Sequence, residues 1–159
     1  MAYPDAIRME REDLDHIPPV TLPDGYSIRP YEPGDKEHWL AIHHDAEKYI
    51  EATPTLFTEQ FGTEVEELRA RQFYLCHGEE VVGTCSAWYE KSYKDGTWGR
   101  VHWLAIREAH QGKGLSKALL GHTLLVMKAL GHTKAVLTTL RRRLVAVRLY
   151  ENYGFRIVE

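Results

Sequence analysis

The amino-acid sequence predicts a mixed α/β (α+β) fold, with one mostly antiparallel sheet flanked by helices. Turn signals at 78–79 and 94–96 separate runs rich in β-branched and aromatic residues, which is the pattern of antiparallel hairpins. A strand-like run at 98–106 is then followed by an apolar helical segment at 115–130 and a second strand-like run at 134–139. A β-α-β unit of this kind joins parallel strands, so the sheet is expected to be mixed.

The first half of the chain predicts one strand and two helices before the hairpins. Residues 26–31 alternate well enough for a strand, and Pro33-Gly34-Asp35 then turns the chain. Asp35 is expected to cap a helix that runs to about Ala46. A second, polar helix is expected over 58–71, with its acidic residues on a solvated face.

The second half of the chain alternates strands and helices. Gly131 is expected to end the apolar helix, because glycine accepts the left-handed backbone found at helix ends. The remaining elements are expected as strands at 72–77 and 80–90, a short helix at 143–153 and a last strand that starts at Gly154-Phe155.

The composition fits a single folded domain. The chain has 159 residues, of which 43% are hydrophobic and 27% charged, which supports a packed core and argues against disorder. A net charge of −3 gives no reason to expect nucleic acid or a membrane as a partner, because both usually recruit strongly basic domains. Cys76 and Cys85 fit no C-x-x-C pattern and are expected to be reduced core thiols.

The N-terminal segment is distinct in composition. Residues 1–25 are rich in proline and charge and are expected to form an arm that leads into a domain at 26–159. Within the arm, Ile7 to Arg11 is expected to add an edge strand. The arm lacks an apolar signal region and the chain has no run of 18 apolar residues, so we expect a cytoplasmic protein without a membrane span.

The most informative segment joins the strand that ends at Ile106 to the apolar helix. Gln111-Gly-Lys-Gly-Leu-Ser116 opens that helix after a short polar turn. The first turn of a helix has N–H groups without intrahelical partners and lies at the positive end of the helix dipole. Gly112 and Gly114 would let an anion approach the backbone, and Lys113 adds a positive charge. The sequence therefore predicts an anion site, with a pyrophosphate as the expected ligand.

Two nucleotide-binding patterns fit this junction poorly. A Walker A loop fails because Arg107 stands where its first glycine is required, and Gly114 follows the lysine in place of Ser or Thr. A dinucleotide fingerprint needs a third glycine where Lys117 stands. The alternative to an anion site is a glycine-rich loop that only connects the strand to the helix.

The same segment resembles the GNAT superfamily of acyl-CoA N-acyltransferases. The family's phosphate motif, Gln/Arg-x-x-Gly-x-Gly/Ala, is similar to Gln111-x-x-Gly114-x-Ser116, and Leu104-Ala105-Ile106 looks like the strand end that precedes it. Downstream, Ala146-x-x-Leu149-Tyr150-x-x-x-Gly154-Phe155 resembles the family's second signature. The resemblance covers residues 26–159. It implies the acyl-CoA N-acyltransferase fold, whose single mixed sheet is split at a central strand.

Three departures from the family pattern have expected consequences. Ser116 replaces the family's last Gly or Ala, and its hydroxyl could itself donate to a phosphate. Arg143 stands where the family often has Asn, so a hydrogen bond that supports CoA is expected to be lost or replaced. The chain stops at Glu159, where the family usually adds another strand. The N-terminal arm, or a second subunit in a homodimer, is then expected to cover that edge.

The resemblance implies an N-acetyltransferase that transfers the acetyl group from acetyl-CoA, as co-substrate, to an amine by direct attack in a ternary complex. Leu104 and Ile106 would bond the pantetheine, and the N–H near Ala105 and Ile106 would polarise the thioester carbonyl. The expected cofactor-binding residues are Leu104, Ala105, Ile106, Gln111, Gly112, Lys113, Gly114, Leu115 and Ser116.

His102 is the candidate general base. An alkylamine with a pKa of about 10.4 costs roughly 4–5 kcal/mol to deprotonate at pH 7, so a base is useful. Strand alternation puts His102 on the same face as Leu104 and Ile106. The serotonin N-acetyltransferases of the family have a histidine at this strand position. A histidine that packs or meets solvent is an equal alternative, and Glu90 is the reserve base.

Tyr150 is the candidate general acid for the departing thiolate, because of its place in the second signature. A thiol pKa of about 8.5 makes the thiolate a tolerable leaving group, so an acid helps without being essential. The helical spacing of Ala146, Leu149, Tyr150 and Tyr153 also fits a core tyrosine.

Two other functions stay open at this stage. The same CoA site could belong to a catalytically inactive regulatory or interaction module. The cations at 141–143 could contact the CoA 3′-phosphate or nucleic acid, although the net charge argues against a nucleic-acid module. No metal is expected, because His43-His44 lies on a helix without ligand spacing. The acceptor is not identified, and its pocket is expected from 31–71 and the hairpin at 90–98.

Overall fold

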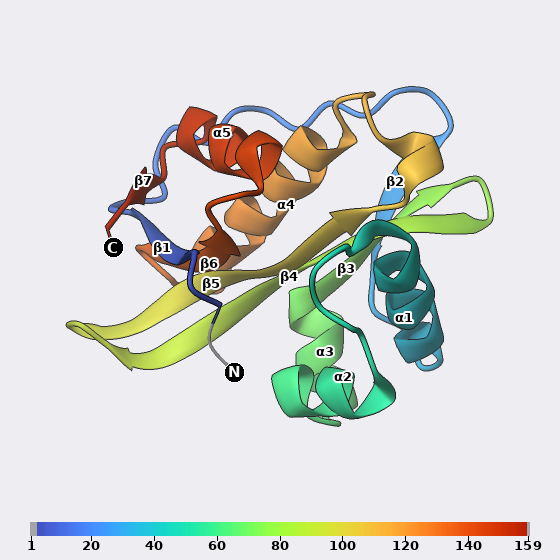
Figure 1. Cartoon of the computed structure of the whole chain (residues 1–159), viewed down its shortest axis with the longest axis horizontal. Coiled ribbons are helices and arrows are strands. Elements are labelled where there is room, and N and C mark those ends of the chain that lie inside the picture. Colours follow the sequence, from blue (N-terminus) through green and yellow to red (C-terminus); the bar gives the residue numbers. More distant parts are fainter. Residues whose placement is uncertain (1–2, 159) are drawn as a thin grey trace.

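The computed structural model describes residues 3–158, which form one seven-stranded sheet with helices on both faces (Figure 1). The strand order is β2-β3-β4-β5-β6-β1-β7, and only the β5–β6 pair is parallel. The predicted mixed, mostly antiparallel sheet is therefore confirmed. The strands are β1 (Ala6–Arg11), β2 (Tyr26–Pro30), β3 (Gln72–His77), β4 (Glu80–Tyr93), β5 (Gly96–Ile106), β6 (Ala135–Leu140) and β7 (Arg156–Ile157). The helices are α1 (Asp35–Ala46), α2 (Pro54–Phe61), α3 (Val65–Arg71), the 3₁₀ turn η1 (Glu108–His110), α4 (Leu115–Ala129) and α5 (Leu144–Asn152).

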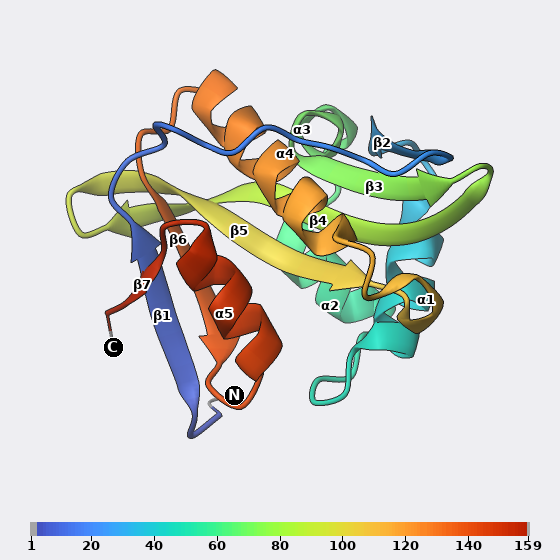
Figure 2. The ribbon, with the colours of Figure 1, turned by 90° about the horizontal axis from the view of Figure 1, so that it is seen from above.

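Each face of the sheet has its own core. α4 and α5 cover one face, and α1, α2 and α3 cover the other (Figures 1 and 2). Leu119 and Cys85 lie in the core beneath α4, whereas Trp39 and Cys76 lie in the core on the other face. Both cysteines are free and buried, which confirms that prediction. Within residues 3–158, we find no helix with the length and apolar character needed to span a membrane.

The predicted single helix over 58–71 is wrong, because the structure has two helices in this part of the chain. Gly62 has a left-handed φ of 72° and ends α2, and α3 begins only three residues later. The start of α2 is fixed by Thr53, whose hydroxyl accepts a hydrogen bond from the backbone N–H of Leu56 (3.0 Å).

The other predicted elements are present, with boundaries shifted by a few residues. α1 has its predicted bounds, but Asp35 does not cap it. The Asp35 carboxylate instead binds the Arg29 guanidinium (2.7 and 2.9 Å) and the backbone N–H of Glu32 (2.7 Å). Gly131 has a φ of 97° just beyond α4, as expected for its role at the helix end.

β1 lies inside the sheet and not at its edge as predicted. All six residues of Ala6–Arg11 pair with β6, and β7 pairs with β1 on its other side. Met9 is fully buried in the core beneath α4. The Arg11 guanidinium donates to the carbonyl oxygen of Tyr153 (2.8 Å) and so ties β1 to the end of α5. From β1 the chain crosses over α4 to reach β2 (Figure 2).

Replacement of Met9 by Ala is expected to lower the free energy of unfolding by about 2–5 kcal/mol, because it empties space at a fully buried position. Urea unfolding measures the difference. Thr21→Ala is the matched control, since Thr21 is exposed in the same N-terminal segment and its change should cost less than about 0.5 kcal/mol. Equal stability of the Met9 variant and the parent protein would contradict a core position for β1.

Candidate functional site: a cleft in the split sheet

β5 and β6 are neighbours at one end only and then separate. Their parallel pairing is limited to Gly99 opposite Ala135 and Arg100 opposite Val136. Beyond Arg100, β5 has no strand beside it on that side among residues 3–158, while β6 continues along β1 (Figure 2). The sheet is therefore split at a central strand, and the second half of β5 offers its free backbone edge to a ligand.

A cleft of about 760 Å³ opens at this split. Its volume lies in the range of small-molecule sites. The end of β5, the loop that starts α4, the loop after α1 and the β6–α5 turn all contribute to its walls. Lys113 is not among the lining residues. The expected cofactor-binding residues that do line the cleft are Leu104, Ala105, Ile106, Gln111, Gly112, Gly114, Leu115 and Ser116.

The backbone groups of Leu104 and Ile106 face away from β4 and toward the split. The N–H of Arg107 donates to the carbonyl oxygen of Val82 on β4 (2.8 Å). In an antiparallel pair, alternate residues direct their backbone groups to the partner strand, so those of Leu104 and Ile106 point to the other side. The Ile106 carbonyl accepts a hydrogen bond from Nε2 of Gln111 (2.8 Å). This bond holds the glycine-containing loop against the end of the strand.

The loop has the backbone conformation that its glycines predict. Gly112 and Gly114 have left-handed φ values of 81° and 78°, and a Cβ on either would meet no non-neighbouring atom within 4 Å. Gly114 is the N-cap of α4 and no side chain caps that helix. The first N–H groups of α4, those of Leu115 and Ser116, therefore have no hydrogen-bond partner within the helix. They lie beside the cleft, at the positive end of the helix dipole. This arrangement suits a phosphate group.

A bulge at Trp103 changes which side chains of β5 share a face. The register against β4 shifts by one residue between Ala105 and His102, and Trp103 has a left-handed φ of 58°. His102 and Trp103 therefore both point toward the core under α1 and α2, while Leu104 and Ile106 pack in the core beneath α4. The prediction that His102 shares a face with Leu104 and Ile106 is wrong, because side-chain alternation stops at the bulge.

His102 is buried in this core and is not a lining residue of the cleft. Its ring lies 5.3 Å from the ring of Phe61. Burial, together with the positive charge of Arg100, lowers the pKa of His102 well below its usual value, so the imidazole is neutral at pH 7. His43 lies against Trp103 in the same core, where burial lowers its pKa to about 4. The geometry does not bring His102 into contact with a ligand in the cleft.

Tyr150 lines the cleft from α5. Its side chain is also largely buried in the core beneath α4, and its ring packs edge-on against Phe155 at 6.1 Å. Burial raises the pKa of Tyr150 well above its usual value, which keeps the phenol protonated and able to donate a hydrogen bond. The same side chain thus packs in the core and lines the cleft, and its role as general acid stays a prediction.

Glu90, the reserve base, lies away from the cleft. Its carboxylate pairs with Arg8 on β1 (3.0 Å) and with Arg100 on β5 (3.5 Å). These ion pairs connect three strands at the end of the sheet where β5 and β6 are still paired. Glu90 is therefore placed to stabilise the closed end of the split.

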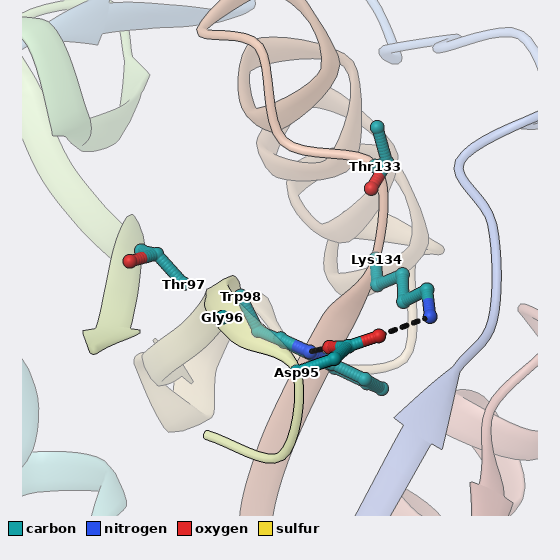
Figure 3. Close-up of a pocket in the computed structure, with 6 residues that line it drawn as sticks. All are labelled: Asp95, Gly96, Thr97, Trp98, Thr133 and Lys134. Atoms are coloured by element: carbon teal, nitrogen blue, oxygen red, sulfur yellow. Dashed lines mark hydrogen bonds and ion pairs between the residues drawn. The ribbon is translucent and has the colours of Figure 1, made fainter. Parts of the chain in front are cut away.

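The hairpin at 90–98 contributes no lining residue to the cleft. Its tip instead borders a separate small hollow (Figure 3). There the Asp95 carboxylate accepts hydrogen bonds from Nε1 of Trp98 (2.7 Å) and Nζ of Lys134 (2.9 Å), as the dashed lines show. Because these polar groups bind one another, the hollow offers little to a ligand.

An ion pair that sequence analysis missed joins two walls of the cleft, the loop after α1 and the β6–α5 turn. Glu47, just after α1, accepts hydrogen bonds from the Arg143 guanidinium (2.6 Å) and from the backbone N–H groups of Tyr49 (2.7 Å) and Ile50 (3.0 Å). Burial acts to raise the pKa of Glu47, but these bonds and the charge of Arg143 outweigh it, so the pKa is lowered. Arg142 and Arg143 also lie over the Tyr49 ring, at 5.0 and 5.2 Å.

Replacement of Glu47 by Gln is expected to lower the free energy of unfolding by about 1–3 kcal/mol at pH 7, because the amide keeps the shape and leaves Arg143 without its anion. The folded-state pKa of Glu47 lies below its ordinary value of 4.5. The stabilisation is therefore complete above that value and is lost as the pH falls through the folded-state pKa.

Urea unfolding of the Glu47 variant and the parent protein at a series of pH values tests this expectation. The difference in stability should shrink as the solution becomes more acid. Glu51→Gln is the control, since Glu51 is exposed in the same loop. An equal loss in the control, or a difference that grows in acid, would contradict the assignment.

The comparisons with known proteins agree with this geometry. Residues 28–155 match the model of the acetyltransferase (GNAT) family. Mycothiol acetyltransferase from Thermobispora bispora is 29% identical to the chain over 164 residues, which cover 93% of this chain and 52% of that protein. The chain thus spans about half the length of this curated relative.

Solved structures show the same fold at low sequence identity. The GCN5-related N-acetyltransferase from Sphaerobacter thermophilus has a TM-score of 0.76 and 22% identity, covering 96% of this chain and 48% of that chain. Arabidopsis thaliana Naa50, in complex with the bisubstrate analogue CoA-Ac-MVNAL, has a TM-score of 0.68 and 13% identity, covering 85% of each chain. The family match includes the split strand, the glycine-containing loop and Tyr150, and the chain belongs to the acetyltransferase (GNAT) family.

Proposed function

We propose that the protein is an N-acetyltransferase that transfers the acetyl group of acetyl-CoA to an amine by direct attack in a ternary complex. One observation carries the proposal: a free strand edge and an uncapped helix N-terminus meet in one cleft. A strand edge binds the amide groups of an extended chain, and a helix N-terminus binds phosphate. Acetyl-CoA contains both features, an amide-bearing pantetheine arm and a pyrophosphate.

The proposed donor position follows from the directions of the backbone groups. The pyrophosphate would lie on the loop from Gly112 to Ser116, which Gln111 holds in place. The pantetheine would pair with the edge from Leu104 to Ile106. Of the two N–H groups expected near the thioester, that of Ile106 faces the split, so it is the proposed donor to the thioester carbonyl oxygen. Lys113 does not line the cleft, so it would attract the pyrophosphate through its positive charge and not through direct contact.

The amine must lose its proton before it attacks the thioester carbon. His102 lies in the core under α1 and α2, behind the bulge, and its lowered pKa makes it a weak base. We therefore propose that the proton leaves through water in the cleft, with any contribution from His102 relayed by such water. When the tetrahedral intermediate collapses, the carbon–sulfur bond breaks and the thiolate departs. Tyr150 is the proposed donor of a proton to that sulfur.

Replacement of Tyr150 by Phe is expected to lower kcat by about 10²-fold, with a smaller rise in KM for acetyl-CoA, because the lost hydroxyl acts on the departing sulfur. Steady-state kinetics with saturating acceptor measures both constants. Tyr153→Phe is the matched control, since Tyr153 lies at the end of α5 and outside the cleft lining. An unchanged kcat in the Tyr150 variant would remove the proposed role.

An acceptor screen with detection of released thiol tests the function as a whole. The protein should release CoA from acetyl-CoA only when a suitable amine is present. The panel should contain small amines and peptides with free N-termini, because the related proteins include a mycothiol acetyltransferase and an enzyme bound to a CoA–peptide analogue.

Calorimetry with CoA distinguishes the proposal from a binding module without turnover. CoA binding with thiol release supports the enzyme. CoA binding without thiol release across the panel would favour the regulatory or interaction module. Absence of CoA binding at millimolar concentration would overturn both.

A further inference from the structure

We propose that His77, Glu80 and His110 form a site for a divalent transition-metal ion, with zinc as the representative ion. One donor atom from each residue lies within 4.8 Å of the donors of the other two. The three residues come from the end of β3, the start of β4 and η1. The site was not expected from the sequence, because its ligands are not spaced as a motif. The argument for this site does not rest on the proposed acetyl transfer.

The backbone brings two of the ligands together. His77 and Glu80 flank the tight turn at Gly78-Glu79 and are opposite each other in the β3–β4 register. His110 reaches the same point from η1, with its Nε2 3.6 Å from a carboxylate oxygen of Glu80. Zinc holds such ligands at about 2.0–2.2 Å, which places them about 3.5 Å apart in a tetrahedral site. Glu80 is an exposed ligand, so its side chain can rotate to shorten its distances to the two imidazoles.

Tyr26 orients both imidazole rings. Its hydroxyl is hydrogen-bonded to Nδ1 of His110 at 2.7 Å, which leaves Nε2 of His110 directed at Glu80. Its ring also packs against the ring of His77, with a centroid distance of 4.5 Å. Histidine ligands of metal ions usually have their second ring nitrogen fixed by a hydrogen bond of this kind. The cluster therefore has both a set of ligands and a residue that orients them.

The ligand set defines the class of ion. Two imidazoles and one carboxylate are typical ligands of zinc and leave a fourth position for water. Magnesium and calcium prefer sites made of oxygen ligands alone. A bound ion would connect the β3–β4 turn to η1, and His110 is itself a lining residue of the cleft. The ion would thus stabilise the turn that precedes the glycine-containing loop.

Isothermal calorimetry with zinc chloride on metal-free protein without a polyhistidine tag tests the proposal. We expect one ion per chain and an increase in melting temperature on binding. His77→Ala and Glu80→Gln should each weaken binding at least about 10-fold. Glu79→Gln is the matched control, because Glu79 is an exposed carboxylate in the same turn and outside the cluster, and it should bind zinc as the parent protein does.

Tyr26→Phe separates an oriented site from a chance grouping of side chains. Loss of the hydroxyl should weaken zinc binding about 10- to 100-fold while leaving the three ligands in place. Thermal melts of each metal-free variant check that it is folded. Absence of saturable binding, or unchanged affinity in the folded His77 and Glu80 variants, would overturn the site. Thiol release is assayed separately on metal-free protein, so failure of either proposal is recognised without the other.

Discussion

The site depends on the two-residue contact between β5 and β6. Had these strands paired along their full length, the edge from Leu104 to Ile106 would be occupied by β6 and unable to bind a ligand. β6 is instead held on its other side by all six residues of β1. The ion pairs of Glu90 with Arg8 and Arg100 stabilise the end where the strands still meet. The fold thus keeps one edge of the second half of β5 unpaired, while the other edge stays paired with β4.

The bulge at Trp103 belongs to the same arrangement. A left-handed φ is costly for a bulky residue, on the order of 1–3 kcal/mol, and persists only where packing requires it. The Trp103 ring packs edge-on against Trp39 at 5.5 Å, and its Nε1 donates to the side chain of Gln60 (3.1 Å). These contacts with α1 and α2 offset the backbone strain. The helices on that face therefore support the shape of the strand edge on which the cleft is built.

Local signals in the sequence predicted the parts of the structure that local chemistry decides. The hairpin turns, the glycine-containing loop, the start and end of α4 and the position of Tyr150 follow from residue types at short spacing. The bulge at Trp103 could not be predicted this way, because no glycine or asparagine marks it and tertiary packing imposes it. Glu47 and Arg143, or His77 and His110, become neighbours only when distant segments meet. The break at Gly62 was a local signal, and the polar pattern of 58–71 obscured it.

The position of β1 has a consequence for the order in which the chain folds. Ala6 pairs with Leu140, so β1 finds its partner only after the long segment between β1 and β6 has been made. Contacts between such distant segments slow folding, because a long loop must close before they form. Until β1 docks, β6 has an uncovered edge that another chain could join. Docking of β1 therefore covers an edge of β6 that would otherwise be open to association with another chain.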